Sequence, residues 1–361
     1  MKIEVYSPTI RRKEMDAVLT ALVEDKIGPG DQTKLLVQIA KEKIGFDFCI
    51  ALRSPAIALY LALQSLGLEE GQAVVISALS PRYFQSVLDD LKLKAVYADV
   101  AVGSPCMNRE TIEKALQSKP EDITVRAVVI QHALGYPVNI NPISELGFPI
   151  IEDCSQSYGS VIGNTDEANT ENSGSSVNTC VFSILGLEEK DMLTAGGGAL
   201  LYTASRRDST TLRNALNSRP AGELPPEYGL PDMNAAMAVV QFREAAKNME
   251  RRKEIAVIYS QAASRTRHKC FFHDAEKDVY NNYAFPLILE TGMKDVKAYA
   301  RRKEIFVESA FEKTLSGSGI VLLEQCPEAY SLSLRTILFP LYPRLRAEEI
   351  ERVSKLIVTL P

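Results

Sequence analysis

Short apolar runs separated by helix-length segments are the feature of this sequence that most limits its fold. Five such runs lie in the first half of the chain: Cys49 to Leu52, Val74 to Ser77, Ala95 to Val100, Ala127 to His132, and Pro149 to Asp153. Strands that consist of continuous apolar runs are buried on both faces, and the helices between them connect the strands of a parallel sheet. The sequence therefore predicts a three-layer α/β domain.

Helical periodicity marks both ends of the chain and a long segment between them. The first predicted helix runs from about Thr9 to Glu24, and the Gly28-Pro29-Gly30 turn ends it. Further helices are predicted from Asp232 to Ser264 and from Ala347 to Leu360. Long helices often join domains, so we expect a large domain over residues 1–245, including an N-terminal arm, and a smaller C-terminal α+β domain over residues 246–361.

Residues 163–178, GNTDEANTENSGSSVN, contain almost no apolar side chains. Such a segment cannot offset the entropy of ordering by burial, so the sequence predicts a mobile surface loop. Two more strands are predicted after it, from Cys180 to Leu185 and from Ala199 to Thr203.

Composition and charge exclude several classes of partner. With 46% apolar residues among 361, the chain can form two hydrophobic cores. The net charge of -5 comes from 41 basic and 46 acidic residues scattered along the sequence, so no basic surface for nucleic acid or membrane is expected. Residues 1–8 lack the pattern of a secretory signal, and no later stretch is long and apolar enough for a bilayer, so we expect a cytoplasmic protein.

Cysteine and histidine spacing indicates neither a disulfide framework nor a metal centre. The six cysteines are widely separated and form no CxxC pair. The three histidines, His132, His268 and His273, have no helical HxxxH or HExxH spacing. We therefore expect no metal.

Five segments in order resemble the sugar-nucleotide aminotransferase family, the DegT, DnrJ and StrS group. They are ALRSPAIALYLALQSLGLEEGQAVVIS at 51–77, QHALGYPVN at 131–139, IIEDCSQSYGS at 150–160, CVFSILGLEEKDMLTAGGGALLYT at 180–203 and FPLYPRLRAEEIERVSKLI at 339–357. The resemblance implies a type I aminotransferase fold that binds pyridoxal 5'-phosphate (PLP) at the interface of a homodimer. It also implies transfer of an amino group from an amino acid to a keto group of a nucleotide sugar, as in polysaccharide biosynthesis.

PLP chemistry needs a carboxylate that keeps the ring nitrogen protonated and donors that hold the phosphate. The resemblance places Asp153 at the ring nitrogen, Gln156 beside the ring hydroxyl and Ser183 at the phosphate. Each residue also has an ordinary interpretation, as a strand-end cap, a turn glutamine and a strand serine. His132 matches a strand-end histidine of the family, but we expect a structural hydrogen bond there.

The phosphate cradle departs from the family pattern. Where the family has a Ser-Gly-Thr turn, this chain has Ser54-Pro55-Ala56. The resemblance therefore aligns Ser54 and Ala56 with positions at which the family binds the cofactor. Serine as N-cap and proline at the first helical position favour the helix, but proline lacks an amide donor and alanine lacks the hydroxyl. We therefore expect a weakened cradle.

Two further departures lie near the ring and the partner subunit. Pro81 stands where the family has a stacking aromatic residue, and Tyr83 or Phe84 can reach the ring instead. Glu227 lies in the turn that reaches the neighbouring cofactor, where its charge would repel a phosphate.

The lysine that binds the cofactor in the family aligns with Lys190 of this chain when residues are counted back from Gly196-Gly197-Gly198. It aligns with Glu188 when they are counted forward from Phe182-Ser183. Two residues are therefore inserted in this segment, and a loop can absorb them. The acidic neighbours of Lys190 are also typical of a solvated loop lysine. Two hypotheses follow: a PLP-dependent aminotransferase with Lys190 as its catalytic lysine, or a non-catalytic homologue that acts as a binding or interaction module. A PLP enzyme of a different reaction type, such as a dehydratase, is an intermediate case.

Overall fold

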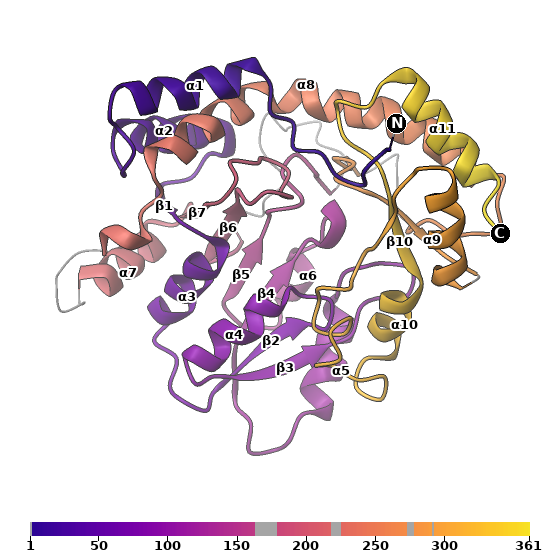
Figure 1. Ribbon diagram of the computed structural model, residues 1–361. Coiled ribbons are helices and arrows are strands. Elements are labelled where there is room, and N and C mark those ends of the chain that lie inside the picture. The colour runs from indigo at the N-terminus through magenta and orange to yellow at the C-terminus, as the bar shows by residue number, and fades with distance from the viewer. Residues whose placement is uncertain (1, 163–178, 218–224, 273–277, 291) are drawn as a thin grey trace.

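The computed structural model describes residues 2–162, 179–217, 225–272, 278–290 and 292–361 (Figure 1). A seven-stranded sheet forms the centre of the larger part of the chain, and a three-stranded sheet lies in the smaller part. The predicted α/β fold with a smaller α+β part is confirmed. The predicted loop at 163–178 lies outside the described residues. In the described part of the chain, we find no helix with the length and apolarity that a membrane span requires.

The large sheet has the strand order β1-β7-β6-β5-β4-β2-β3. Its strands are β1 (Phe48–Leu52), β2 (Ala73–Ser77), β3 (Lys94–Ala98), β4 (Val125–Gln131), β5 (Ile150–Asp153), β6 (Phe182–Gly186) and β7 (Ala199–Thr203). β7 runs antiparallel to both of its neighbours, and the other pairs are parallel. All seven predicted strands are present, with ends shifted by at most two residues.

Helices cover both faces of the large sheet. The α2 (Asp31–Ile44) and α8 (Asp232–Ala263) helices pack on one face, and α3 (Pro55–Ser65) and α4 (Arg82–Asp90) pack on the other. β6 shows the alternation, because Ile184 joins the core beneath α3 while Leu185 joins the core beneath α8. This part also contains α1 (Arg12–Val23), α5 (Arg109–Ser118), α6 (Asn141–Ser144), α7 (Arg206–Asn217), and the short η1 (Ala133–Gly135) and η2 (Pro226–Tyr228).

The smaller part has its own core. Its sheet has the order β8-β10-β9, and its elements are β8 (Phe285–Ile288), α9 (Met293–Arg302), β9 (Glu308–Ser309), α10 (Pro327–Arg335), β10 (Thr336–Phe339) and α11 (Ala347–Val358). Ile255 and Tyr259 from the end of α8 are fully buried in this core, together with Ile3 from the N-terminal segment. The boundary between residues 245 and 246 stays a prediction, and it falls inside α8.

The α8 helix ties distant parts of the chain together. Its first residue, Asp232, accepts hydrogen bonds from the backbone N–H groups of Gly30 (2.8 Å), Gln32 (3.0 Å) and Thr33 (2.9 Å). These groups start α2, so Asp232 caps a helix 200 residues earlier. The predicted helix itself is confirmed.

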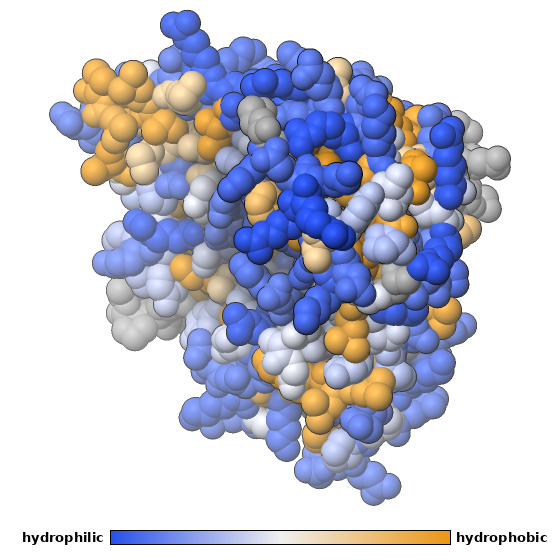
Figure 2. All heavy atoms as spheres, turned by 45° about the vertical axis from the view of Figure 1, so that its right-hand side comes forward, coloured by the Kyte–Doolittle hydropathy of each residue, from blue (hydrophilic) through white to orange (hydrophobic). Residues whose placement is uncertain are grey.

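The α1 helix (Arg12–Val23) is also confirmed, but its apolar side chains face outward. Met15, Leu19 and Val23 are each more than half exposed. The inward face instead buries Glu14 and Ala21, and the Gln241 amide of α8 donates a 3.0 Å hydrogen bond to Glu14. Figure 2 shows an apolar cluster at the end of the molecule where Figure 1 places α1.

Candidate functional site

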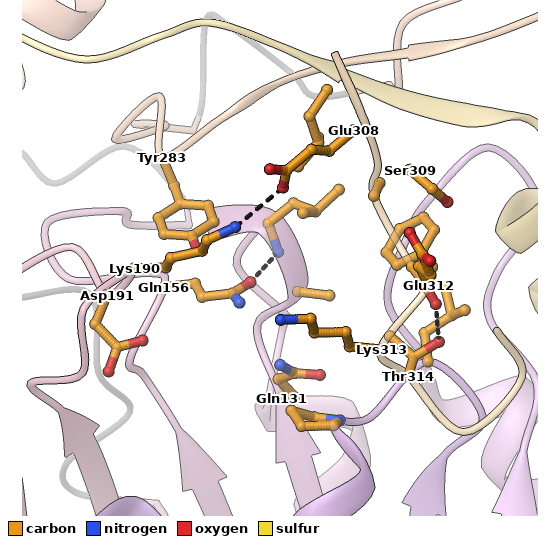
Figure 3. Close-up of a pocket in the computed structure, with 17 residues that line it drawn as sticks. Gln131, Gln156, Lys190, Asp191, Tyr283, Glu308, Ser309, Glu312, Lys313 and Thr314 are labelled. Atoms are coloured by element: carbon orange, nitrogen blue, oxygen red, sulfur yellow. Dashed lines mark hydrogen bonds and ion pairs between the residues drawn. The ribbon is translucent and has the colours of Figure 1, made fainter. Parts of the chain in front are cut away.

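A pocket of about 270 Å³ lies between the large and the small parts of the chain (Figure 3). The large part contributes segments that follow the carboxyl ends of β2, β4, β5 and β6, and the small part contributes the segment from Glu308 to Thr314. Ligands of open α/β sheets bind outside the carboxyl ends of the strands. The pocket is therefore the candidate functional site.

Backbone pairing fixes the small part against the wall of this pocket. The N–H of Leu315 donates to the carbonyl of Ser80 (3.0 Å), and the N–H of Ser316 donates to the carbonyl of Ala78 (2.9 Å). Pro81 and Thr314 form the bridge next to these bonds. Residues 311–314 are thereby held at the pocket by two backbone hydrogen bonds rather than by side chains alone.

Asp153 ends β5 and is buried. Its Oδ2 accepts a 2.8 Å hydrogen bond from the Tyr83 hydroxyl, and its Oδ1 accepts from the N–H and the Oγ of Ser155. Burial, followed by the charge of Asp153, raises the pKa of Tyr83 well above its usual value, so Tyr83 stays a donor. Both oxygens of the carboxylate already have partners, and Asp153 does not line the pocket itself.

Gln156 lines the pocket and supports the backbone of η1. Its Oε1 accepts a 2.6 Å hydrogen bond from the N–H of Leu134. Leu134 has a left-handed backbone conformation (φ 55°), which costs a branched residue energy and needs support from its surroundings. The glutamine therefore has a structural partner at the place where the resemblance expects a cofactor contact.

Ser183 does not reach the pocket. It pairs with Glu152 across β5 and β6, and its hydroxyl donates a 2.6 Å hydrogen bond to Oε1 of that buried carboxyl group. His132 also contacts this group, with 3.3 Å between its Nε2 and Oε2 of Glu152. The three side chains form a buried polar cluster beneath the pocket, and His132 has the structural contact that its sequence context predicts.

His132, Glu152 and Cys154 place potential metal-ligand atoms within 4.8 Å of one another, but their protonation does not suit a metal. Nδ1 of His132 accepts a 2.9 Å hydrogen bond from the N–H of Val138, so the imidazole proton lies on Nε2 and points toward Glu152. Burial, with the charges of Glu152 and Asp153, raises the pKa of Cys154 well above its usual value. The three side chains thus form a protonated, hydrogen-bonded cluster in this structure.

Lys190 lines the pocket, but its amine points toward the small part of the chain. Its Nζ lies 3.0 Å from a carboxylate oxygen of Glu308, and its side chain is 47% exposed (Figure 3). Lys190 lies in a turn from Glu188 to Asp191, in which the N–H of Asp191 donates a 3.1 Å hydrogen bond to the carbonyl of Glu188. In this structure Lys190 is a half-exposed lysine at the rim of the pocket.

Asp191 takes a more central position than sequence reasoning expected. It lines the pocket and is half-buried, and its Oδ2 accepts a 2.8 Å hydrogen bond from the N–H of Glu188. A methyl group at Gly186 would overlap Asp191 and Ser155, so glycine is required for this approach. Burial, with the charges of Asp153 and Glu188, raises the pKa of Asp191 to about 8.

Gln131 and Lys313 were also missed. Gln131 ends β4 and is 7% exposed, and its Oε1 has no hydrogen-bond partner among the described residues. Lys313 lies in the segment that pairs with Pro81, and Figure 3 shows it reaching across the pocket toward Gln131 and Gln156. Sequence patterns gave no signal for either residue, because strand pairing between the two parts of the chain brings them together.

The predicted cradle residues lie outside this pocket. Ser54 caps α3 as predicted and accepts a 3.3 Å hydrogen bond from the N–H of Ile57, and Pro55 takes the first helical position. Neither Ser54 nor Ala56 lines the pocket. Of the predicted site residues, the structure brings Gln156 and Lys190 together at the pocket, while Asp153, which is hydrogen-bonded to Tyr83, does not line it. Ser54, Ala56 and Ser183 lie elsewhere.

Comparisons with known proteins agree with this architecture. A sequence model of the DegT/DnrJ/EryC1/StrS aminotransferase family matches residues 8–358. The aminotransferase TlmJ from Streptoalloteichus hindustanus is similar in structure, with a TM-score of 0.85 and 19% identity over 99% of this chain and 98% of that one. Spr1654 from Streptococcus pneumoniae, in its PLP-form, has a TM-score of 0.86 and 18% identity over 99% and 98%. At these identities the structural likeness establishes the fold.

Proposed function

Because the chain belongs to the DegT/DnrJ/EryC1/StrS aminotransferase family, we propose that it binds PLP at the interdomain pocket and transfers an amino group from an amino acid to the keto group of a nucleotide-linked sugar. The observation that carries this proposal is the environment of Asp153. This buried carboxylate lies at the carboxyl end of β5 and accepts a 2.8 Å hydrogen bond from a hydroxyl group. A protonated ring nitrogen needs the same acceptor.

The residues present fit the cofactor once Tyr83 turns aside. PLP would supply an aldehyde and an electron-withdrawing ring. Asp153 would hold the ring nitrogen, Gln156 would bind the ring hydroxyl, and Lys190 would supply the amine. In this structure the Tyr83 hydroxyl donates to the oxygen of Asp153 that the protonated ring nitrogen would use. If Tyr83 turned away, Asp153 would exchange one hydrogen bond for another.

Lys190 can leave its present partner at little cost. The ion pair with Glu308 is about half exposed on both sides, and such surface pairs contribute roughly 0–1 kcal/mol. The side chain of Lys190 makes a further contact, with its Nζ 6.0 Å from the centroid of the Tyr6 ring. The exposed ion pair supports a lysine side chain that can swing from the rim into the pocket.

Asp191 contributes a protonated carboxyl group to the pocket. Its raised pKa of about 8 keeps this carboxyl group neutral at neutral pH, so it adds no negative charge next to Asp153. A neutral carboxyl group can donate a hydrogen bond into the pocket and can exchange a proton with a bound substrate. A carboxylate there would instead repel the phosphate of a cofactor.

A second candidate function is a non-catalytic homologue that acts as a binding or interaction module. Three observations favour it: Tyr83 occupies Asp153, Lys190 pairs with Glu308, and the Ser54 cradle lies outside the pocket. In this interpretation the contacts of Tyr83 and Lys190 are permanent, and the pocket takes a ligand without PLP.

One experiment separates the two functions. The protein is loaded with PLP and reduced with borohydride, and its peptides are mapped by mass spectrometry. The aminotransferase proposal expects a phosphopyridoxyl group on Lys190 that Lys190→Ala removes, while Lys114→Ala, in α5 outside the pocket, keeps it. If Lys190→Ala binds PLP as well as wild type and no aldehyde-derived absorbance appears, the binding-module interpretation stands.

The oligomeric state belongs to the same proposal. We infer a homodimer, because the apolar residues Met15, Leu19 and Val23 on α1 are exposed and form a surface that needs a cover. The N-terminal arm and the homodimer are both expectations from the sequence. A cytoplasmic location stays a prediction.

A further inference from the structure

We propose that Lys313 and Gln131 form a subsite that binds the zwitterionic head group of an α-amino acid. The inference deepens the proposed function, because it assigns a recognition role for the amino donor to two residues outside the expected cofactor set. It does not need PLP to be bound, so it can be tested on the cofactor-free protein.

Lys313 is the more available of the two lysines that line the pocket. Lys190 forms the 3.0 Å ion pair with Glu308. In the described part of the chain Lys313 makes no hydrogen bond or ion pair, and its side chain reaches across the pocket (Figure 3). An unpaired ammonium group in a pocket is a binding partner for a carboxylate, with which it forms a charge-assisted hydrogen bond.

The backbone beneath Lys313 is held in place. Thr314 forms the bridge to Pro81, and its hydroxyl donates a 2.7 Å hydrogen bond to the carbonyl of Phe311. Phe311 itself is buried. The lysine therefore projects from a fixed segment, so ligand binding needs to order only its side chain.

Gln131 supplies the second contact. It is 93% buried, since its exposed fraction is 7%, and it lines the pocket with an Oε1 that has no partner among the described residues. Buried amide oxygens are almost always hydrogen-bonded, so an unpaired one indicates a missing donor. Rotation about the terminal torsion can turn either end of the amide toward the pocket. The ammonium group of an α-amino acid provides such a donor.

The charges of the pocket match a ligand that carries both signs. Two lysines, Lys190 and Lys313, and two glutamates, Glu308 and Glu312, line it, so their formal charges cancel. Asp191 adds no charge near neutral pH, because burial raises its pKa to about 8. A ligand with only a negative or only a positive charge would pair with the groups of one sign and leave the others without a partner in the ligand. We expect an α-amino acid to place its carboxylate near Lys313 and its ammonium group near Gln131.

L-Alanine is a suitable probe, because it consists of the two recognised groups and one methyl group. Binding is measured by NMR titration of the full-length protein without PLP, for L-alanine and for two analogues that each lack one group, propionate and ethylamine. We expect L-alanine to bind more tightly than either analogue. Lys313→Met should weaken L-alanine binding about tenfold, as expected for loss of a hydrogen bond to a charged group.

Conservative and matched variants complete the design. Lys313→Arg keeps the charge and should retain most of the affinity, whereas Lys294→Met removes an exposed lysine of α9 outside the pocket and should change nothing. Gln131→Leu should weaken L-alanine binding but leave that of propionate nearly unchanged. Circular dichroism confirms that each variant is folded.

Three results would overturn the subsite: no saturable binding of L-alanine, equal binding of propionate and L-alanine, or equal affinity in Lys313→Met and wild type. Each of these is independent of the Lys190 mapping experiment. Loss of the PLP reaction with an intact subsite would reject the proposed function alone. A labelled Lys190 with no Lys313-dependent binding would reject the subsite alone.

Discussion

The hydroxyl of Tyr83 donates a 2.8 Å hydrogen bond to Oδ2 of Asp153. Tyr83 lies on the first turn of α4, which follows β2, and Asp153 ends β5. The contact therefore joins segments that follow two strands separated by β4 in the large sheet. Because Ser155 occupies the other oxygen of Asp153, any ligand that needs this carboxylate competes with the protein's own side chain.

Tyr83→Phe should therefore raise the affinity for PLP while it lowers stability. Removal of the hydroxyl frees Oδ2 of Asp153. Because PLP then no longer competes with Tyr83 for this oxygen, we expect its affinity to rise about tenfold. The same change leaves a buried oxygen unpaired, which costs about 1–3 kcal/mol in the free energy of unfolding. Spectroscopic PLP titration and urea denaturation measure the two effects.

Tyr97→Phe is the matched control for this substitution, because the Tyr97 hydroxyl also donates a 2.8 Å hydrogen bond, to Gln85 outside the pocket. It should leave PLP affinity unchanged. A lower PLP affinity in Tyr83→Phe would show instead that the hydroxyl supports the cofactor.

Asp191 should make stability fall as pH rises. Its pKa is about 8 in the folded protein and about 3.9 in an unfolded chain. Between these values the folded state binds more protons than the unfolded state, so the free energy of unfolding decreases with pH. Asp191→Asn removes this dependence. The free energy of unfolding of the variant, relative to that of wild type, should therefore be larger at pH 8 than at pH 5, by on the order of 1–3 kcal/mol.

Urea unfolding of Asp191→Asn and wild type at pH 5, 6.5 and 8 provides the measurement. Asp90→Asn, an exposed aspartate at the end of α4, is the control and should follow the wild-type curve. A constant difference between Asp191→Asn and wild type at all three pH values would contradict the raised pKa.

Ser183→Ala should destabilise the protein without changing PLP affinity. The hydroxyl donates to Glu152 in the buried cluster, so its loss removes one donor from this buried carboxyl group and costs about 1–3 kcal/mol. The resemblance to the family instead places this hydroxyl at the phosphate, where its loss would reduce affinity. PLP titration decides between them, and a tenfold weaker binding with normal stability would favour the phosphate contact.

The α1 surface should control self-association. Leu19→Glu places a charge on the exposed apolar face and should convert the proposed dimer to a monomer in light scattering. Val102→Glu is a suitable control, because Val102 is also an exposed apolar residue but lies away from α1, between β3 and α5. A monomeric wild-type protein at micromolar concentration would contradict the dimer.

Sequence patterns predicted the strands well because most of their residues are buried, and those of β2, β5, β6 and β7 are buried on both faces. A short apolar run such as Ile150–Asp153 predicts a buried strand, and this prediction does not depend on which face packs against which helix. The apolar residues of α1 are different, because periodicity predicts the helix but not the face that it buries. Glu14 takes the inward position since Gln241 provides a partner for its carboxylate.

The site was predicted only in part, because its geometry depends on contacts distant in sequence. Gln156 and Lys190 were found through the resemblance and both line the pocket. The partner of Lys190, Glu308, is 118 residues away, and the partner of Asp153, Tyr83, is 70 residues away. Spacing within a motif carries no information on such pairs. It also could not distinguish which acidic residue of the inserted turn would face inward, and Asp191 does.

The cap that Asp232 forms on α2 has a consequence for synthesis on the ribosome. The first turn of α2 obtains its hydrogen-bond acceptor only after 200 further residues have been translated. At about 5–20 residues per second this delay is about 10–40 s. During that interval α1 and α2 lack the helix that they pack against, and their apolar side chains are accessible to chaperones and proteases. The growing chain is thus most vulnerable at its beginning.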